Sequence, residues 1–217
     1  MAVGPVAVAH GRLYGREVHP SHTAKESLMA DTAAAGDVVD ILTADHREMV
    51  GLLEMIENTA DAEERRSLAD SAIAEVVRHS VAEELFVYPV YEREVPGGTD
   101  EVEHDKEEHQ ELEEVMKELE GLDAGSAEFI ATVKRFTELL DHHADDEEAD
   151  QFPKMRKHIS AEDLVDLGRK VEAAKKIAPT RPHPGSPHSE LFHMTLGPGV
   201  GMVDRLRDAL SGRAKNT

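Results

Sequence analysis

The chain has 217 residues, with 24 Lys and Arg against 45 Asp and Glu, and its formal charge is −21 with the 13 His counted as neutral. Such a charge repels phosphate backbones and anionic lipid surfaces, which argues against nucleic acid or a membrane as a partner and favours metal cations. Cys is absent, which excludes disulfides, thiolate nucleophiles and iron–sulfur clusters, so any metal must bind His, Asp or Glu.

Residues 1–36 mix Gly, Pro, His and small residues without a helical or strand period, and we expect a flexible N-terminal segment. Neither a secretory signal nor an apolar run long enough to span a membrane is evident, so we expect a cytoplasmic protein. Aromatic residues make up only 4% of the chain and Trp is absent, so the core must consist of aliphatic side chains. This composition favours helices over sheets.

Gly and Pro breaks, and residues that typically begin helices, predict four long helices and a shorter fifth. The expected helix starts are Asp61, Thr99, Ser126 and Ser160. The connections are short, so successive helices must be antiparallel neighbours. Residues 37–176 are therefore predicted to form an all-α domain, an antiparallel up-down four-helix bundle with a short fifth helix. The expected helices cover residues 37–59, 61–94, 99–120, 126–158 and 161–176.

Residues 177–217 form a mildly basic tail rich in Pro and Gly. Apolar residues at 202, 203, 206 and 210 suggest one short amphipathic helix within it. We expect the tail either to dock on the acidic bundle or to stay mobile. Its histidines are expected at the surface rather than on a metal: His183, His188 and His193.

Each long helix carries an apolar stripe, in which residues recur at alternate spacings of three and four and face the bundle core. Histidine and glutamate interrupt all four stripes, at His46, His79, Glu83, His109, His143 and Glu147. One such histidine alone is more often a hydrogen-bonded core residue than a ligand. Six buried imidazoles and carboxylates together cost too much without a shared compensation, and a metal centre provides it.

The pattern also repeats within the chain. His79 and Pro89 bound the segment HSVAEELFVYP, which matches HADDEEADQFP from His143 to Pro153 in the positions of His, Glu, Glu and Pro. The histidines of the first and third helices are 63 positions apart, and those of the second and fourth are 64 apart. A duplicated helical hairpin would place equivalent residues around a pseudo-twofold axis, an arrangement suited to two metals bridged by two carboxylates.

With this pattern of H, HxxxE, H and HxxxE, residues 37–158 resemble the hemerythrin-like family, the hemerythrin HHE cation-binding domains, and the tail is similar to those of actinobacterial members. The resemblance implies a non-haem di-iron site with two iron ions in a four-helix bundle. It also implies that Glu83 and Glu147 bridge the irons, that His46 and His79 bind one iron, and that His109 and His143 bind the other.

The sequence departs from oxygen-carrying hemerythrins, which have five histidines, two of them one turn apart in the third helix. Here Asp105 lies one turn before His109, and we expect it to accept an imidazole N–H rather than bind metal, although ligation stays open. His142 offers an alternative to His143, but the stripe and the repeat favour His143. His104 lies off the stripe and is expected to be solvated.

No Tyr is expected on the stripe beside the ligands, since Tyr88 and Tyr91 lie one or two turns beyond Glu83. With two histidines for each iron and no fifth, both irons are expected to keep exchangeable positions. We therefore expect reaction with small oxidants, as hydrogen peroxide decomposition or peroxide-dependent nitric oxide oxidation. The alternatives are reversible oxygen or nitric oxide binding, sensing of iron or oxygen without turnover, and a structural zinc site.

Overall fold

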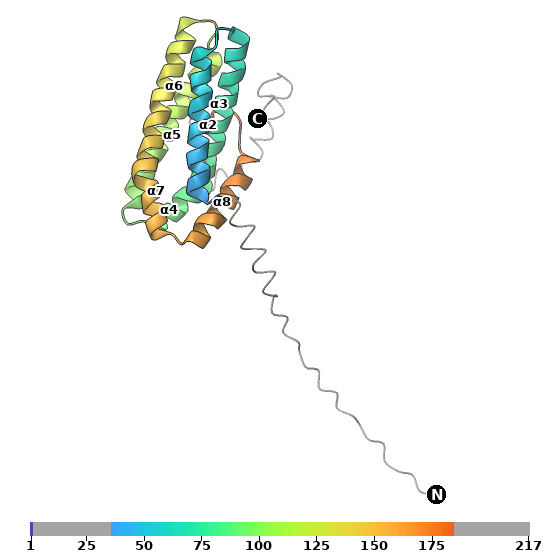
Figure 1. Ribbon diagram of the computed structural model, residues 1–217, viewed down its shortest axis with the longest axis vertical. Helices are drawn as coiled ribbons and strands as arrows, with labels where there is room; N and C mark the ends of the chain where they lie inside the picture. Colours follow the sequence, from blue (N-terminus) through green and yellow to red (C-terminus); the bar gives the residue numbers. More distant parts are fainter. Residues whose placement is uncertain (2–35, 185–217) are drawn as a thin grey trace. The chain divides into compact units, whose positions relative to one another are not determined.

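The computed structural model describes Met1 and residues 36–184, and every regular element in this part of the chain is helical (Figure 1). The predicted all-α bundle with a short fifth helix is confirmed, and the helices lie close to their expected bounds. Expectations for residues 2–35 and 185–217, including His188, His193 and the helix after residue 201, lie outside the described residues. The elements are α2 (Val38–Asn58), α3 (Ala62–Ala82), η1 (Glu83–Val87), α4 (Tyr88–Glu94), α5 (Gly98–Gly121), α6 (Ala127–Asp146), η2 (Glu147–Gln151), α7 (Phe152–His158) and α8 (Ala161–Lys175).

Helices α2, α3, α5 and α6 run side by side along the bundle, and α8 packs against α2, α3 and η1 (Figure 1). None of the helices within residues 36–184 is long and apolar enough to cross a membrane. The stripe residues of the long helices face inward and form one continuous apolar core. Its largest fully buried side chains include Leu42, Met49, Leu53, Ile56, Ile73, Leu112, Met116, Leu119, Phe129 and Phe136.

Side chains cap the helix N-termini as the sequence predicts at three of the four expected positions. Asp61, Ser126 and Ser160 each accept a backbone N–H three residues ahead, at 2.9 to 3.1 Å. Thr99 was expected to begin the third long helix, but α5 already begins at Gly98. The preceding Gly97 has a φ of 84°, a left-handed conformation that glycine adopts without a Cβ penalty, so the turn itself positions the helix start.

Two π turns interrupt the second and fourth long helical segments at equivalent places. Each begins at a glutamate of the repeat and ends with an N–H five residues on that bonds to the glutamate carbonyl: Tyr88 to Glu83 and Phe152 to Glu147. A π turn holds one residue more than an α turn, so the residue five positions on returns to the glutamate's face. The helical segments over 61–94 and 126–158 therefore have the predicted extent. The prediction did not include the π turns, which change by one residue the face on which the following side chains lie.

Helix α8 covers only one side of the bundle, and it approaches the start of α2 closely. A Cβ on Gly168 would lie 2.9 Å from Ile41 Cδ1 and 3.1 Å from the Val38 backbone N. At the other end of α8, Lys175 Nζ donates to Asp45 Oδ1 on α2 at 2.6 Å. After this helix the chain stays against the bundle through Thr180, whose side chain is buried.

Candidate metal centre

Six charged or polar side chains from α2, α3, η1, α5, α6 and η2 meet in the middle of the bundle. They are the six residues that the sequence analysis selected, and none is more than 2% exposed: His46, His79, Glu83, His109, His143 and Glu147. The two glutamates are the first residues of the two π turns. Each lies one turn after a histidine of the same helical segment, so the segment presents both side chains on one face.

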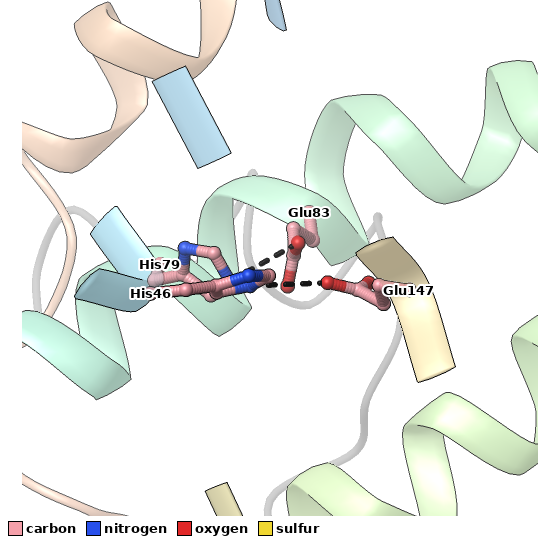
Figure 2. Close-up of side chains that lie close together, drawn as sticks. All are labelled: His46, His79, Glu83 and Glu147. Atoms are coloured by element: carbon pink, nitrogen blue, oxygen red, sulfur yellow. Dashed lines mark hydrogen bonds and ion pairs between the residues drawn. The ribbon is translucent and has the colours of Figure 1, made fainter. Parts of the chain in front are cut away.

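The histidines form two pairs, each joined through Nε2. His46 and His79 form the first pair, with an Nε2–Nε2 distance of 3.2 Å. His79 Nε2 lies 3.1 Å from Glu83 Oε1, and His46 Nε2 lies 3.2 Å from Glu147 Oε2. Figure 2 shows these four side chains, with both rings directed at the two carboxylates. Two imidazoles and two carboxylates thus surround one point.

His109 and His143 form the second pair, with an Nε2–Nε2 distance of 3.3 Å. Glu83 reaches it through its other oxygen, Oε2, at 3.4 Å from His109 Nε2. Glu147 Oε2 lies 3.8 Å from His143 Nε2. Each carboxylate therefore lies between one histidine of each pair, which is the position of a bridging ligand.

The outward nitrogen of every one of these histidines faces a carboxylate on another helical segment. His46 Nδ1 lies 2.9 Å from Glu148, and His79 Nδ1 lies 3.4 Å from Asp45. In the second pair, His109 Nδ1 lies 3.0 Å from Glu84 Oε1 and His143 Nδ1 lies 2.8 Å from Glu108 Oε2. A carboxylate at Nδ1 holds the proton there and leaves Nε2 free to bind a cation.

Sequence reasoning missed these four outer carboxylates, although a signal was present. Each one is the chain neighbour of a residue in the cluster: Asp45 of His46, Glu84 of Glu83, Glu108 of His109, and Glu148 of Glu147. Each of these four acids reaches across to an imidazole on another helical segment. Exposed acids are common in this chain, so the signal was indistinguishable from a solvated helix flank.

Several carboxylate oxygens in the cluster are buried without a hydrogen-bond partner. They are both oxygens of Glu83, Oε2 of Glu147 and Oδ2 of Asp105. An unpaired buried carboxylate oxygen is costly, and a cation within the cluster would compensate it. Imidazole with carboxylate, and no sulfur, suits iron, manganese or zinc. The residues therefore fit a metal centre.

Without a cation, protons have to balance the carboxylates. Burial by itself lowers the pKa of His79, but the charges of Glu83 and Asp45 outweigh burial and raise that pKa to about 10. Burial also works against the charge of Glu83, yet His79 and His109 hold the pKa of this carboxyl well below its usual value. A metal ion that binds here must displace the imidazole proton.

Asp105 is buried beside the second histidine pair, but it does not accept an imidazole N–H as the sequence analysis expected. Its Oδ1 accepts a hydrogen bond from Gln151 Nε2 at 2.8 Å, while the Nδ1 atoms of both nearby histidines face other acids. Burial and the charge of Glu147 raise the pKa of Asp105 to about 7. Its unpaired Oδ2 leaves ligation open.

Tyr88 lies directly beside the centre, contrary to the expectation from its helical position. Its hydroxyl lies 3.1 Å from His109 Nε2, and its ring stacks on that imidazole. The π turn is the reason, because Tyr88 follows Glu83 by five residues and returns to its face. Phe152 has the equivalent place after Glu147 and stacks on His46 at a centroid distance of 5.8 Å.

The structure also separates the neighbouring histidines of the sequence analysis. His143 is 1% exposed, whereas the side chains of His142 and His104 are 64% and 57% exposed. Among the described residues, the groups able to share a cation do not include His183. The apolar stripe therefore predicted correctly that His143 is buried and that His142 and His104 are exposed.

A family model described as the hemerythrin HHE cation binding domain matches residues 37–155. An uncharacterized hemerythrin-like protein from Schizosaccharomyces pombe is 30% identical over 174 residues, which cover 80% of this chain and 86% of that protein. The crystal structure of a hemerythrin HHE cation binding domain-containing protein from Mycobacterium kansasii matches with a TM-score of 0.58 and 24% identity, covering 65% of this chain and 86% of that one.

The chain belongs to the hemerythrin HHE cation-binding domain family, as the spacing of its histidines and glutamates suggested. Family membership and the buried cluster of His and Glu side chains together indicate metal binding.

Proposed function

We propose that the chain holds two iron ions and reacts with small oxidants. His46 and His79 would bind one ion, His109 and His143 the other, and Glu83 and Glu147 would bridge them. Two observations support this assignment: the histidines are arranged as two pairs, and each glutamate lies between the pairs. Three of the four glutamate oxygens have no hydrogen-bond partner in the protein.

Iron at these positions would accept two electrons from one hydrogen peroxide molecule, which leaves as oxygen, and would pass them to a second, which is reduced to two molecules of water. The protein contributes the orientation of the ligands and a hydroxyl beside them. The carboxylates at Nδ1 keep the four Nε2 atoms directed at the centre. Apolar residues of the bundle surround the centre and limit the access of water.

The single observation that favours peroxide chemistry over storage is the hydroxyl of Tyr88, 3.1 Å from His109 Nε2. Cleavage of an O–O bond develops negative charge on the departing oxygen, which a hydrogen-bond donor held nearby stabilises. Burial and the charge of Glu83 raise the pKa of Tyr88 well above its usual value, so the hydroxyl keeps its proton. Tyr88 is thus a neutral hydrogen-bond donor beside the second histidine pair. The same donor would serve peroxide-dependent oxidation of nitric oxide.

Iron analysis and oxygen evolution test this proposal. The purified protein should contain about two irons per chain and release oxygen when hydrogen peroxide is added. An oxygen-bound visible spectrum that reverses under vacuum, without gas release from peroxide, would instead assign reversible binding or sensing. A colourless protein that contains zinc would contradict the di-iron proposal.

A further inference from the structure

The outer face of α5 and α6 carries a second cluster of possible metal ligands, directly outside the buried centre. Two pairs spaced by four residues face each other there, His104 with Glu108 on α5 and His142 with Asp146 on α6. His104 Nε2 lies 3.5 Å from Glu108 Oε1, and His142 Nε2 lies 3.7 Å from the same oxygen. His142 Nε2 also lies 3.9 Å from Asp146 Oδ2. His104, Glu108 and Asp146 therefore lie close enough together to share one ion, and His142 lies within 3.9 Å of both carboxylates.

These spacings are close to those of ligands that share one ion. Metal–nitrogen and metal–oxygen bonds of roughly 2.0 to 2.2 Å place neighbouring ligand atoms about 3 to 3.5 Å apart. The observed distances of 3.5 to 3.9 Å are wider by a few tenths of an ångström. The side chains of His104, His142 and Asp146 are 48 to 64% exposed, so small rotations can close this gap.

Glu108 belongs to both the surface cluster and the buried centre. Its Oε2 lies 2.8 Å from Nδ1 of the buried His143, while its Oε1 faces the two exposed histidines. The Glu108 side chain itself is 13% exposed. A cation at the surface cluster would thus be connected to the centre through the Glu108 carboxylate and the His143 imidazole.

The equivalent place in the other half of the bundle lacks these ligands. The internal repeat aligns His104 with Ile41 and His142 with Arg78. Asp45, the counterpart of Glu108, accepts a hydrogen bond from Lys175 of α8 at 2.6 Å. An ammonium group on that carboxylate repels cations, so of these two equivalent places in the described bundle the one on α5 and α6 is where a cation can bind from solvent.

The geometry points to a surface site for a divalent metal ion at His104, Glu108, His142 and Asp146, through which Fe²⁺ reaches the buried centre. The binding site stands on these four residues alone. The loading role rests on the proposed function, because it requires a buried iron centre. An exposed site with imidazole ligands raises the local concentration of Fe²⁺ beside Glu108. This carboxylate contacts the buried His143 and is partly exposed on the α5–α6 face.

Zinc titration of the full chain tests the site, with the imidazole NMR signals of the histidines as readout. We expect the signals of His104 and His142 to change together as Zn²⁺ is added. In His104→Ala, the Zn²⁺ concentration needed to change the His142 signal should rise about tenfold, because one of two imidazole ligands is lost. An unchanged His142 response in this variant would overturn the site.

The rate of Fe²⁺ uptake by the metal-free full chain, without oxygen, tests the loading role. The double variant His104→Ala with His142→Ala should load about tenfold more slowly and reach the same final iron content. The matched control removes two exposed acids of the same helices, Glu103→Ala with Asp145→Ala, and should load at the original rate. Equal rates for both double variants, or a lower final iron content after loss of the histidines, would overturn the loading role. If the unaltered chain takes up no iron, the proposed function fails, while the zinc titration still decides the surface site.

Discussion

The two halves of the bundle are alike where they face the centre and different where they surround it. Each half supplies two histidines and one glutamate that lies between the histidine pairs, and each has a π turn that begins at the glutamate. Around these shared features, Phe152 stacks on His46, whereas Tyr88 places a hydroxyl at His109. The duplication therefore preserves the contacts that the centre requires, and the residues behind them have diverged.

The divergence makes the His109–His143 side the more polar one. The repeat aligns Asp105 with Leu42 and Gln151 with Val87, and in each case the polar residue belongs to the second pair's surroundings. Outside the centre, α8 and Lys175 cover the His46–His79 side, while His104 and His142 on the α5–α6 face have exposed side chains. Ligand count alone predicted two similar ions, but these surroundings favour different reactivity at the two positions.

Loss of a bridging glutamate should have the largest effect, because it affects both sides at once. Glu83→Ala should lose most of the iron, as measured by metal analysis of the purified protein. Chelation of the unaltered chain should lower its free energy of unfolding by on the order of 4 kcal/mol, since tightly bound metal stabilises only the folded state. Denaturant unfolding measures this change. His104→Ala is the control and should retain its iron; equal iron in both variants would contradict the assignment of the centre.

Exchange of the two aromatic residues should distinguish the sides in turnover. Tyr88→Phe removes the hydroxyl beside His109 and should lower peroxide turnover about 10²-fold, as expected for loss of a positioned hydrogen-bond donor. Its iron content should stay unchanged, because the ring still packs. Phe152→Tyr adds a hydroxyl on the other side and serves as the matched control. Full turnover by Tyr88→Phe, measured as oxygen release, would show that the two sides react alike.

Loss of an outer carboxylate should lower iron affinity less than loss of a glutamate of the centre, and the effect should differ between the outer carboxylates. Glu108→Gln removes a 2.8 Å contact to His143, whereas Asp45→Asn removes a 3.4 Å contact to His79. Iron affinity should fall about tenfold or more for Glu108→Gln and by a smaller factor for Asp45→Asn, since such carboxylates orient the ligating imidazole. Competition with a chelator measures both affinities. The opposite ranking would contradict the importance of these hydrogen-bond lengths.

The smallest expected effect is on stability, through the packing of α8 against α2 on the His46–His79 side. In Gly168→Ala the new methyl group would meet Ile41 and the Val38 backbone, so α8 must shift, and stability should fall by about 1 to 3 kcal/mol. Gly51→Ala is the matched control, because no atom lies within 4 Å of its added Cβ, and it should gain about 0.5 to 1 kcal/mol. Thermal unfolding compares the two. Equal shifts would show that α8 does not pack tightly on α2.

Much of the centre could be predicted because its information is local. The spacing of His79 and Glu83, and of His143 and Glu147, places each pair on one helix face whatever surrounds the helix. The apolar stripe then decides which histidines face inward, and it separates the buried His143 from its exposed neighbour His142. Helix ends followed from capping residues, apart from the Gly97 turn.

The helices, the bundle and the six residues that meet in its core could be predicted from the amino-acid pattern, because period and spacing are properties of single helices. The residues that surround these six depend on how the helices pack. The Nδ1 partners lie on other helices, so their identity depends on which helices are neighbours and in what register. The π turns shift the phase by one residue, and this shift moves Tyr88 from an expected flank position to the side of His109. Such a shift depends on the balance of backbone hydrogen bonds and packing across the whole bundle, which no pattern within one helix contains.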